Sequence, residues 1–290
     1  MSEEGPAFEA PVVGEGVKEP GVGAEPSLPG EQGPHGPSDG ATASARRRAL
    51  AGVVGTAVVA TTLAMGFDVA LVDATLLGIL LAALPALALA QVPLAAEVPL
   101  QRIPTYLGSI GFLTLLGFAS WLVGTRSGGA ASIGLVALPP LTLTAWTAGL
   151  VLVGMGVIYL FRALEARLGT VESVVLRELL PRNGSERGVF AVLSAAAGLG
   201  EELAYRGYAV SALAPIVGVG PAAAVTSVAF GVLHGYQGSL GMSRASVIGG
   251  VFAFGFIASG SLWPPIIAHA AIDVLAGIVL GERLLIQPER

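Results

Sequence analysis

Apolar residues form long runs along most of this chain, and polar residues gather in the short segments between the runs. Runs of about 18 to 22 residues are long enough to cross roughly 30 Å of hydrocarbon as an α-helix. The predicted fold class is therefore all-α, a polytopic helical membrane protein. The pattern predicts eight transmembrane helices, at residues 49–67, 70–91, 104–124, 140–161, 189–211, 217–234, 244–260 and 262–281.

The composition agrees with a membrane protein. Of the 290 residues, 53% are hydrophobic and 12% are charged, whereas a soluble domain carries about 25% charged residues. The chain has no cysteine, which excludes disulfides, thiolate metal sites and cysteine catalysis. Its 41 glycines allow helices to approach each other closely through small faces.

The first 45 residues differ from the rest of the chain. Residues 1–45 are rich in glycine, proline and glutamate, almost free of aromatic side chains, and without helical or strand periodicity. Such a segment cannot bury enough apolar area to offset the entropy lost on ordering. We expect a disordered cytoplasmic tail, and His35, which lies in it, is not a candidate for catalysis.

Three arginines, Arg46, Arg47 and Arg48, directly precede the first apolar run. Positive residues beside a span favour a cytoplasmic location, and a secretory signal would not normally follow such a long polar segment. We interpret this run as a signal-anchor in a bacterial cytoplasmic membrane. With eight spans, both termini are expected in the cytoplasm, where residues 282–290 form a short tail.

Residues 162–187 carry arginines interleaved with aliphatic residues at helical spacing. The pattern predicts an amphipathic helix on the membrane surface, ending near Pro181. It separates the N-terminal helices, residues 46–161, from a C-terminal core of four helices, residues 188–281. The segment would serve as an interfacial connector or as a gate for substrate. Its arginines are Arg162, Arg167, Arg177, Arg182 and Arg187.

Three charged residues, Glu201, Glu202 and Arg206, interrupt the fifth apolar run. A charge near the bilayer centre costs about 2.5–3.5 kcal/mol on insertion scales, so such residues usually face a polar cavity or a partner. Glu202 and Arg206 are spaced i,i+4 and can pair on a helix. Glu201 points about 100° away from Glu202, so it is the carboxylate left for chemistry.

Two histidines lie in other spans of the same half. His234 ends the motif Phe230-x-x-x-His234, and His269 shares a helix face with Asp273 at i,i+4 spacing. Taken singly, each has a structural explanation, such as a buried histidine bonded to a carbonyl. Taken together, Glu201, His234, His269 and Asp273 lie on three spans of the C-terminal core, which indicates a functional cluster.

The chemistry that such a cluster supports is hydrolysis. A carboxylate can take a proton from water while an imidazole orients that water or shuttles the proton, which is worth about 10²–10⁴ in rate. We assign the base to Glu201 and an oxyanion donor, worth about 2.7–4 kcal/mol, to His269. An ionised Asp273 cannot donate, so it orients His269 or acts while protonated.

The chain resembles the CPBP family, the CAAX-protease and bacteriocin-processing group, also called the Abi family. The Ras-converting CAAX endopeptidase belongs to this family. The resemblance covers about residues 188–281. It is carried by three motifs in order, Glu201-Glu202-x-x-x-Arg206, Phe230-x-x-x-His234 and His269-x-x-x-Asp273.

The resemblance implies an intramembrane glutamic endopeptidase that hydrolyses peptide bonds of a membrane-associated protein or peptide. In the family's scheme, Glu201 and His234 activate water. His269 and the residue at Asp273 form the oxyanion site, and the best-studied members have asparagine at this last position. By the same resemblance, the supporting residues are Glu202, Arg206 and Phe230.

A zinc enzyme is one alternative, because the family was long described as metalloproteases. Catalytic zinc usually takes three protein ligands, which His234, His269 and either Glu201 or Asp273 could supply. The sequence has no His-Glu-x-x-His signature and no cysteine, so we expect no cofactor.

A non-enzymatic scaffold or transporter is the second alternative, since the same polar cluster could bind a partner, a peptide or an ion. Internal repeats would favour a transporter, and the two halves of the chain show no convincing similarity. The partners we expect are a membrane-associated substrate and the lipid bilayer, and no nucleic acid.

The predicted spans leave one geometric mismatch. Glu201 lies near the middle of the span 189–211, whereas His234 ends the span 217–234 on its cytoplasmic side. At 1.5 Å per residue, the two side chains would differ in depth by about 10 Å.

Overall fold

The computed structural model describes residue 1 and residues 37–95, 97, 100–170 and 173–281. Within these residues the structure is helical and contains no strand. Among the described residues, five helices are long and apolar enough to cross a membrane, and two further apolar helices are shorter. The prediction of an all-α, multi-pass membrane protein is confirmed.

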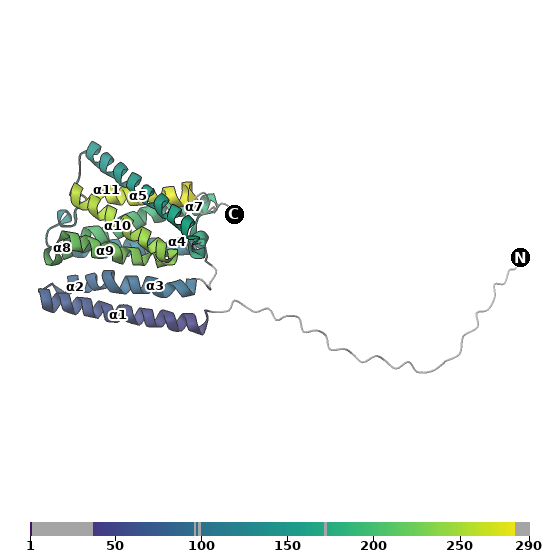
Figure 1. The fold of residues 1–290 in the computed structure, drawn as a ribbon, viewed down its shortest axis with the longest axis horizontal. Helices are drawn as coiled ribbons and strands as arrows, with labels where there is room; N and C mark the ends of the chain where they lie inside the picture. Colours follow the sequence, from purple (N-terminus) through teal and green to yellow (C-terminus); the bar gives the residue numbers. More distant parts are fainter. Residues whose placement is uncertain (2–36, 96, 98–99, 171–172, 282–290) are drawn as a thin grey trace. The chain divides into compact units, whose positions relative to one another are not determined.

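A helical segment of the described chain lies at each of the eight predicted spans (Figure 1), although the segment at residues 184–217 is not among the seven apolar helices just counted. The first four spans are α1 (Asp39–Phe67), α2–η1–α3 (Leu71–Gly78, Ile79–Ala83 and Leu84–Ala95), α4 (Arg102–Thr125) and α5 (Pro140–Leu168). The last four are α7–η3–α8 (Gly184–Glu202, Leu203–Val210 and Ser211–Val217), α9 (Val219–Leu233), α10 (Gly238–Ser259) and α11–η5 (Trp263–Val274 and Leu275–Val279). Short connecting helices are η2 (Ala130–Ile133), α6 (Val174–Leu179) and η4 (Gly235–Gln237).

Helix α1 begins earlier than predicted. The Ser38 hydroxyl caps it by accepting a hydrogen bond from the Ala41 amide at 3.3 Å. Ser38 is itself held by the Glu97 carboxylate, which accepts from its amide at 2.6 Å and from its hydroxyl at 2.9 Å. The prediction of disorder is therefore wrong for residues 39–45. The rest of the predicted tail, at residues 2–36, and the tail at 282–290 lie outside the described residues.

Residues 162–187 are not the single amphipathic helix that we predicted. Helix α5 continues to Leu168 and ends at Gly169, which adopts a φ of 65°. Glycine takes this left-handed conformation without steric cost, so it commonly ends helices. Helix α6 follows as a short separate piece, and the Asn183 side chain then caps α7. The arginines of the segment are thus divided between α5, α6, α7 and the loop between α6 and α7.

The predicted difference in depth between Glu201 and His234 is absent. Helix α9 has 15 residues and pairs with α7–η3–α8 through the turn at Gly218. Glu201 lies 17 residues before Gly218 and His234 lies 16 residues after it. Both side chains are therefore at a similar distance from the turn, and the short sixth span removes the mismatch.

A π-helix ties the N-terminal helices to the motif helix. In a π-helix, each carbonyl accepts from the amide five residues further on. For Leu80 in η1 that residue is Pro85, which has no N–H. The buried hydroxyl of Tyr205 donates to the Leu80 carbonyl at 3.0 Å instead. This bond joins η1 to η3, beside the Glu201-Glu202 pair.

Glycines bring α7 close to its two neighbours. A Cβ at Gly198 would lie 2.7 Å from the carbonyl oxygen of Ile266 in α11. On the other side, a Cβ at Gly117 of α4 would lie 2.8 Å from the Cα of Gly200, and a Cβ at Gly200 would overlap the Leu113 carbonyl. Helix α7 is thus wedged between α4 and α11 at the level of the two glutamates.

We predict that Gly200→Ala lowers stability by about 1–3 kcal/mol, because a backbone carbonyl cannot move aside cheaply. Gly188→Ala in the same helix is the matched control, since its Cβ would meet nothing within 4 Å. The control is expected to be neutral or to stabilise by up to about 1 kcal/mol. Thermal unfolding of the purified protein in detergent measures both, and equal melting temperatures would contradict the close approach of α4 and α7.

Candidate active site

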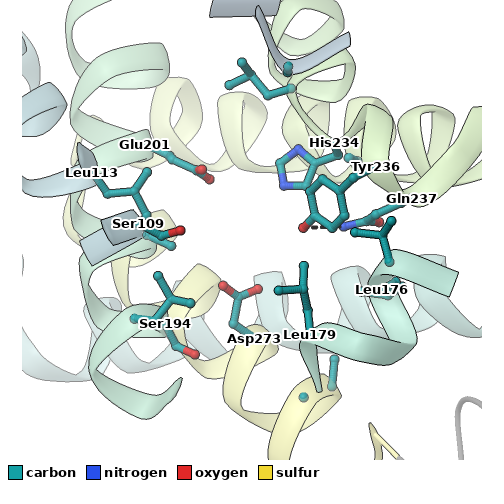
Figure 2. A pocket seen from close by; sticks show the side chains of 18 of the residues that line it. Ser109, Leu113, Leu176, Leu179, Ser194, Glu201, His234, Tyr236, Gln237 and Asp273 are labelled. Carbon is teal, nitrogen blue, oxygen red and sulfur yellow. Dashed lines mark hydrogen bonds between the residues drawn. The ribbon is translucent and has the colours of Figure 1, made fainter. Parts of the chain in front are cut away.

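The four candidate side chains line one cavity. Glu201 comes from α7, His234 directly follows α9, and His269 and Asp273 come from α11. The cavity has a volume of about 820 Å³. Figure 2 shows Glu201 and His234 facing each other across it, with Asp273 between them on a third wall. The structure thus brings together all four residues selected from the sequence.

A buried cluster of charges lies behind this cavity. Glu202 and Arg206 are fully buried, and the Arg206 Nη1 donates to Glu202 Oε1 at 2.8 Å. The same carboxylate oxygen lies 2.9 Å from Nδ1 of His269 on α11. Because an ionised carboxylate only accepts, Nδ1 is the donor in this bond. Glu202 therefore connects its own helix to α11.

The Arg206 guanidinium also stacks on an aromatic ring. Its central carbon lies 4.2 Å from the centroid of the Phe230 ring, a cation–π contact. Gly249 on α10 leaves the space for it, since a Cβ there would lie 2.7 Å from the Arg206 Nη2. Phe230 therefore supports the first motif as well as its own.

Glu201 is held differently from Glu202. Its side chain is 13% exposed and faces the cavity, and its nearest charged partner is His269, with 3.6 Å between Glu201 Oε2 and His269 Nε2. Arg206 pairs with Glu202 instead. The two adjacent carboxylates thus have different surroundings, one in the helix interface and one at the cavity.

His234 presents one ring nitrogen to the cavity. Its Nδ1 lies 3.0 Å from the backbone carbonyl of Phe230, one helical turn earlier. A carbonyl only accepts, so Nδ1 carries the hydrogen in this bond and Nε2 of the neutral ring is an acceptor. The ring also packs 4.8 Å from the Phe230 ring, centroid to centroid. These two contacts hold the imidazole opposite Glu201.

His269 lies among three carboxylates. With Nδ1 bonded to Glu202, its Nε2 points toward Glu201 and toward Asp273, whose Oδ2 is 3.7 Å away. Asp273 is the most exposed member of the set, with 36% of its side chain accessible. When the imidazole is doubly protonated, it has an N–H at each end, and the one on Nε2 faces the cavity.

Three polar residues of this region were not found from the sequence. The Tyr236 hydroxyl accepts from the Gln237 Nε2 at 3.0 Å, and the Gln237 Oε1 accepts from Arg244 Nη2 at 3.0 Å. All three line the cavity. The polar residues that directly follow His234 in the sequence could have drawn attention to them. Helical periodicity, however, does not predict that a short 3-10 turn lies beside the site.

Much of the rest of the cavity wall is apolar. Two of its residues on α3 and α4, Leu87 and Phe112, are 44% and 48% exposed, so this wall reaches the outer surface of the helices. The cavity therefore combines the polar side chains of the candidate site with a large apolar lining. The apolar lining includes Leu84, Leu87, Phe112, Leu113, Leu176 and Leu179.

A zinc site is the alternative that the sequence leaves open. In the part of the chain that the structure describes, no three histidine, aspartate or glutamate side chains converge to hold an ion. Nδ1 of His234 and Nδ1 of His269 both donate to protein oxygens, so the Nε2 atoms are the nitrogens of these two rings that are left as possible ligands.

Comparison with known proteins places the motifs in one family model. Residues 184–275 match the model described as type II CAAX prenyl endopeptidase Rce1-like. The matched segment runs from the start of α7 to η5 and contains all three motifs. The resemblance seen in the sequence is thus confirmed. No curated protein and no solved structure matches the chain.

We predict that Arg206→Met destabilises the protein by about 3–5 kcal/mol, because Glu202 would be left buried without its partner. The double variant Glu202→Gln/Arg206→Met should recover part of this loss. Thermal unfolding in detergent gives the coupling energy.

The control for this experiment is Arg126→Met. Arg126 pairs with Asp73 at a site where 37% of the arginine side chain is exposed, and exposed pairs are worth about 0–1 kcal/mol. Equal losses for Arg206→Met and Arg126→Met would contradict a buried cluster that depends on charge.

Proposed function

We propose that this chain hydrolyses peptide bonds with a water molecule activated by Glu201 and His234. The match of residues 184–275 to the type II CAAX prenyl endopeptidase model supports this proposal. The protein is a CAAX-protease-type peptidase embedded in a membrane. The observation that carries the proposed mechanism is the separation of the two carboxylates. Glu202 is held by Arg206 and His269, whereas Glu201 faces the cavity opposite His234.

In the first step, water lies between Glu201 and the Nε2 of His234. Glu201 takes one proton, and the water oxygen forms a bond to the carbonyl carbon of the substrate. The π electron pair of that carbonyl moves to its oxygen. In the second step this pair returns, the C–N bond breaks, and the leaving nitrogen takes the proton held by Glu201. The products are a carboxylic acid and an amine.

His269 stabilises the negative oxygen formed between the two steps. Its Nδ1 is anchored on Glu202 at 2.9 Å, which fixes the ring and directs Nε2 into the cavity. The N–H on Nε2 of the imidazolium donates to the oxyanion, a contribution of about 2.7–4 kcal/mol. Asp273, 3.7 Å from that nitrogen, holds the ring in its orientation.

The substrate is a membrane-associated protein or peptide that presents its scissile bond between Glu201 and His234. The apolar wall on α3 and α4 suits an apolar side chain or a lipid chain on either side of that bond. We place the N-terminus in the cytoplasm, since Arg46, Arg47 and Arg48 precede the apolar part of α1. A scaffold or transporter is not favoured, because the family match is to peptidases.

Glu201→Gln and His234→Ala test this proposal. The probe is a quenched fluorescent peptide ending in a prenylated CAAX sequence, compared with the same peptide without the prenyl group, in detergent micelles. We expect wild-type protein to cleave at least one peptide, and each variant to lose about 10²-fold or more in rate. Glu178→Gln, a half-exposed carboxylate away from the four residues, is the control and should keep full activity.

Full cleavage by Glu201→Gln would overturn the mechanism, and a wild-type chain that cleaves neither peptide would overturn the proposed function. Circular dichroism and size-exclusion chromatography establish that each variant is folded as the wild type is.

We also propose that the reaction needs no metal ion. Cleavage should therefore continue at an unchanged rate after incubation with 1,10-phenanthroline and gel filtration into chelator. A loss of rate that added Zn²⁺ restores would contradict metal-free hydrolysis. The peptide is the same as above, and a zinc peptidase assayed in parallel establishes that the chelator is effective.

A further inference from the structure

The oxyanion in the proposed mechanism has only one donor so far, the Nε2 hydrogen of His269. Sites of this kind usually provide more than one donor. Asp273 cannot be the second while ionised, because a carboxylate only accepts. We propose that the Tyr236 hydroxyl is a further catalytic group and donates the second hydrogen bond to the oxyanion. This inference rests on the proposed function and extends it.

Tyr236 lies in the right place for this role. It is the middle residue of η4, the turn that follows His234 and leads into α10. Its ring centroid is 6.0 Å from that of His234. Figure 2 shows its hydroxyl oxygen pointing into the cavity, toward which Glu201 and Asp273 point from the other walls.

A chain of hydrogen bonds fixes the direction of the hydroxyl. Arg244 has donors only, so the group of Gln237 that faces it at 3.0 Å is the amide oxygen. The amide nitrogen of Gln237 is therefore the group that donates to the Tyr236 oxygen at 3.0 Å. Among the residues that the structure describes, no acceptor takes the hydrogen of Tyr236. That hydrogen is left to point into the cavity.

The residues around Gln237 fix the position of its side chain. A Cβ at Gly241, one turn further along α10, would overlap the Cβ of Gln237. Arg244 is buried and also lies 3.5 Å from the Glu165 carboxylate of α5. The chain of contacts therefore runs from Glu165 on α5 through Arg244 and Gln237 to Tyr236 in η4. Both α5 and η4 contribute residues to the cavity lining.

The hydroxyl acts without losing its proton. As the carbonyl π pair moves to oxygen, the Tyr236 O–H and the His269 N–H both point at the new charge. When the pair returns and the C–N bond breaks, both hydrogens remain on their original atoms. The tyrosine therefore lowers the barrier only through a hydrogen bond that is stronger in the transition state than in the ground state.

Tyr236→Phe removes the hydroxyl and keeps the ring. We expect kcat for the cleaved CAAX peptide to fall about 10²-fold or more, while KM changes little. Tyr159→Phe on α5, where the side chain is exposed, is the matched control and should keep full activity. A Tyr236→Phe protein with wild-type kcat and unchanged melting temperature would overturn the inference.

Gln237→Leu tests the chain of bonds, because Gln237 is a positioning residue that acts through Tyr236. We expect it to lower kcat by less than Tyr236→Phe does. The double variant Tyr236→Phe/Gln237→Leu should be no slower than Tyr236→Phe alone, since the glutamine has nothing left to orient. Losses that multiply in the double variant would contradict this role.

Glu201→Gln, assayed alongside, separates the two levels of the proposal. If Glu201→Gln is inactive and Tyr236→Phe keeps full kcat, the tyrosine inference alone is wrong. If Glu201→Gln retains activity, or the wild type cleaves neither peptide, the proposed function fails and the inference fails with it.

Discussion

The buried cluster of Glu202, Arg206 and His269 is the interaction on which the rest of the site depends. Taking each charge out of water costs several kcal/mol, so the cluster persists only because its members are close and well oriented. One carboxylate oxygen binds both the arginine of its own helix and the imidazole of α11. This shared oxygen sets the rotation of α7 against α11. It thereby leaves Glu201 on the cavity wall, one residue and about 100° away.

The backbone around the cluster is shaped by residues that contribute no chemistry. Gly198 and Gly200 let α7 approach α11 and α4, and Gly249 leaves room for the guanidinium. Pro85 frees the Leu80 carbonyl that anchors Tyr205, the residue before Arg206. Small faces replace the hydrophobic effect as the basis of helix packing in lipid, so the position of a polar site in the bilayer is set by such contacts.

The sequence predicted the helices and the members of the cluster because both depend on local regularities. Apolar runs gave the spans, and i,i+4 spacing paired Glu202 with Arg206. Features that depend on tertiary contacts could not be predicted from the sequence. They are the capping of α1 by Ser38 and Glu97, the end of α5 at Gly169, and the chain of hydrogen bonds that ends at Tyr236. The short length of α9, which removes the difference in depth between Glu201 and His234, could also not be predicted without knowing that the chain turns at Gly218. The catalytic roles themselves stay predictions.

Direct attack by water is the central claim, and a single turnover in H₂¹⁸O tests it most directly. The measurement is mass spectrometry of the cleaved peptide and of the protease fragment that contains Glu201. If Glu201 acts as a base, one ¹⁸O enters the new carboxyl group of the product and none enters Glu201. If Glu201 instead attacks the carbonyl to form an anhydride, and water opens this anhydride at the Glu201 carboxyl carbon, ¹⁸O appears in the Glu201 carboxylate, which would contradict general-base hydrolysis.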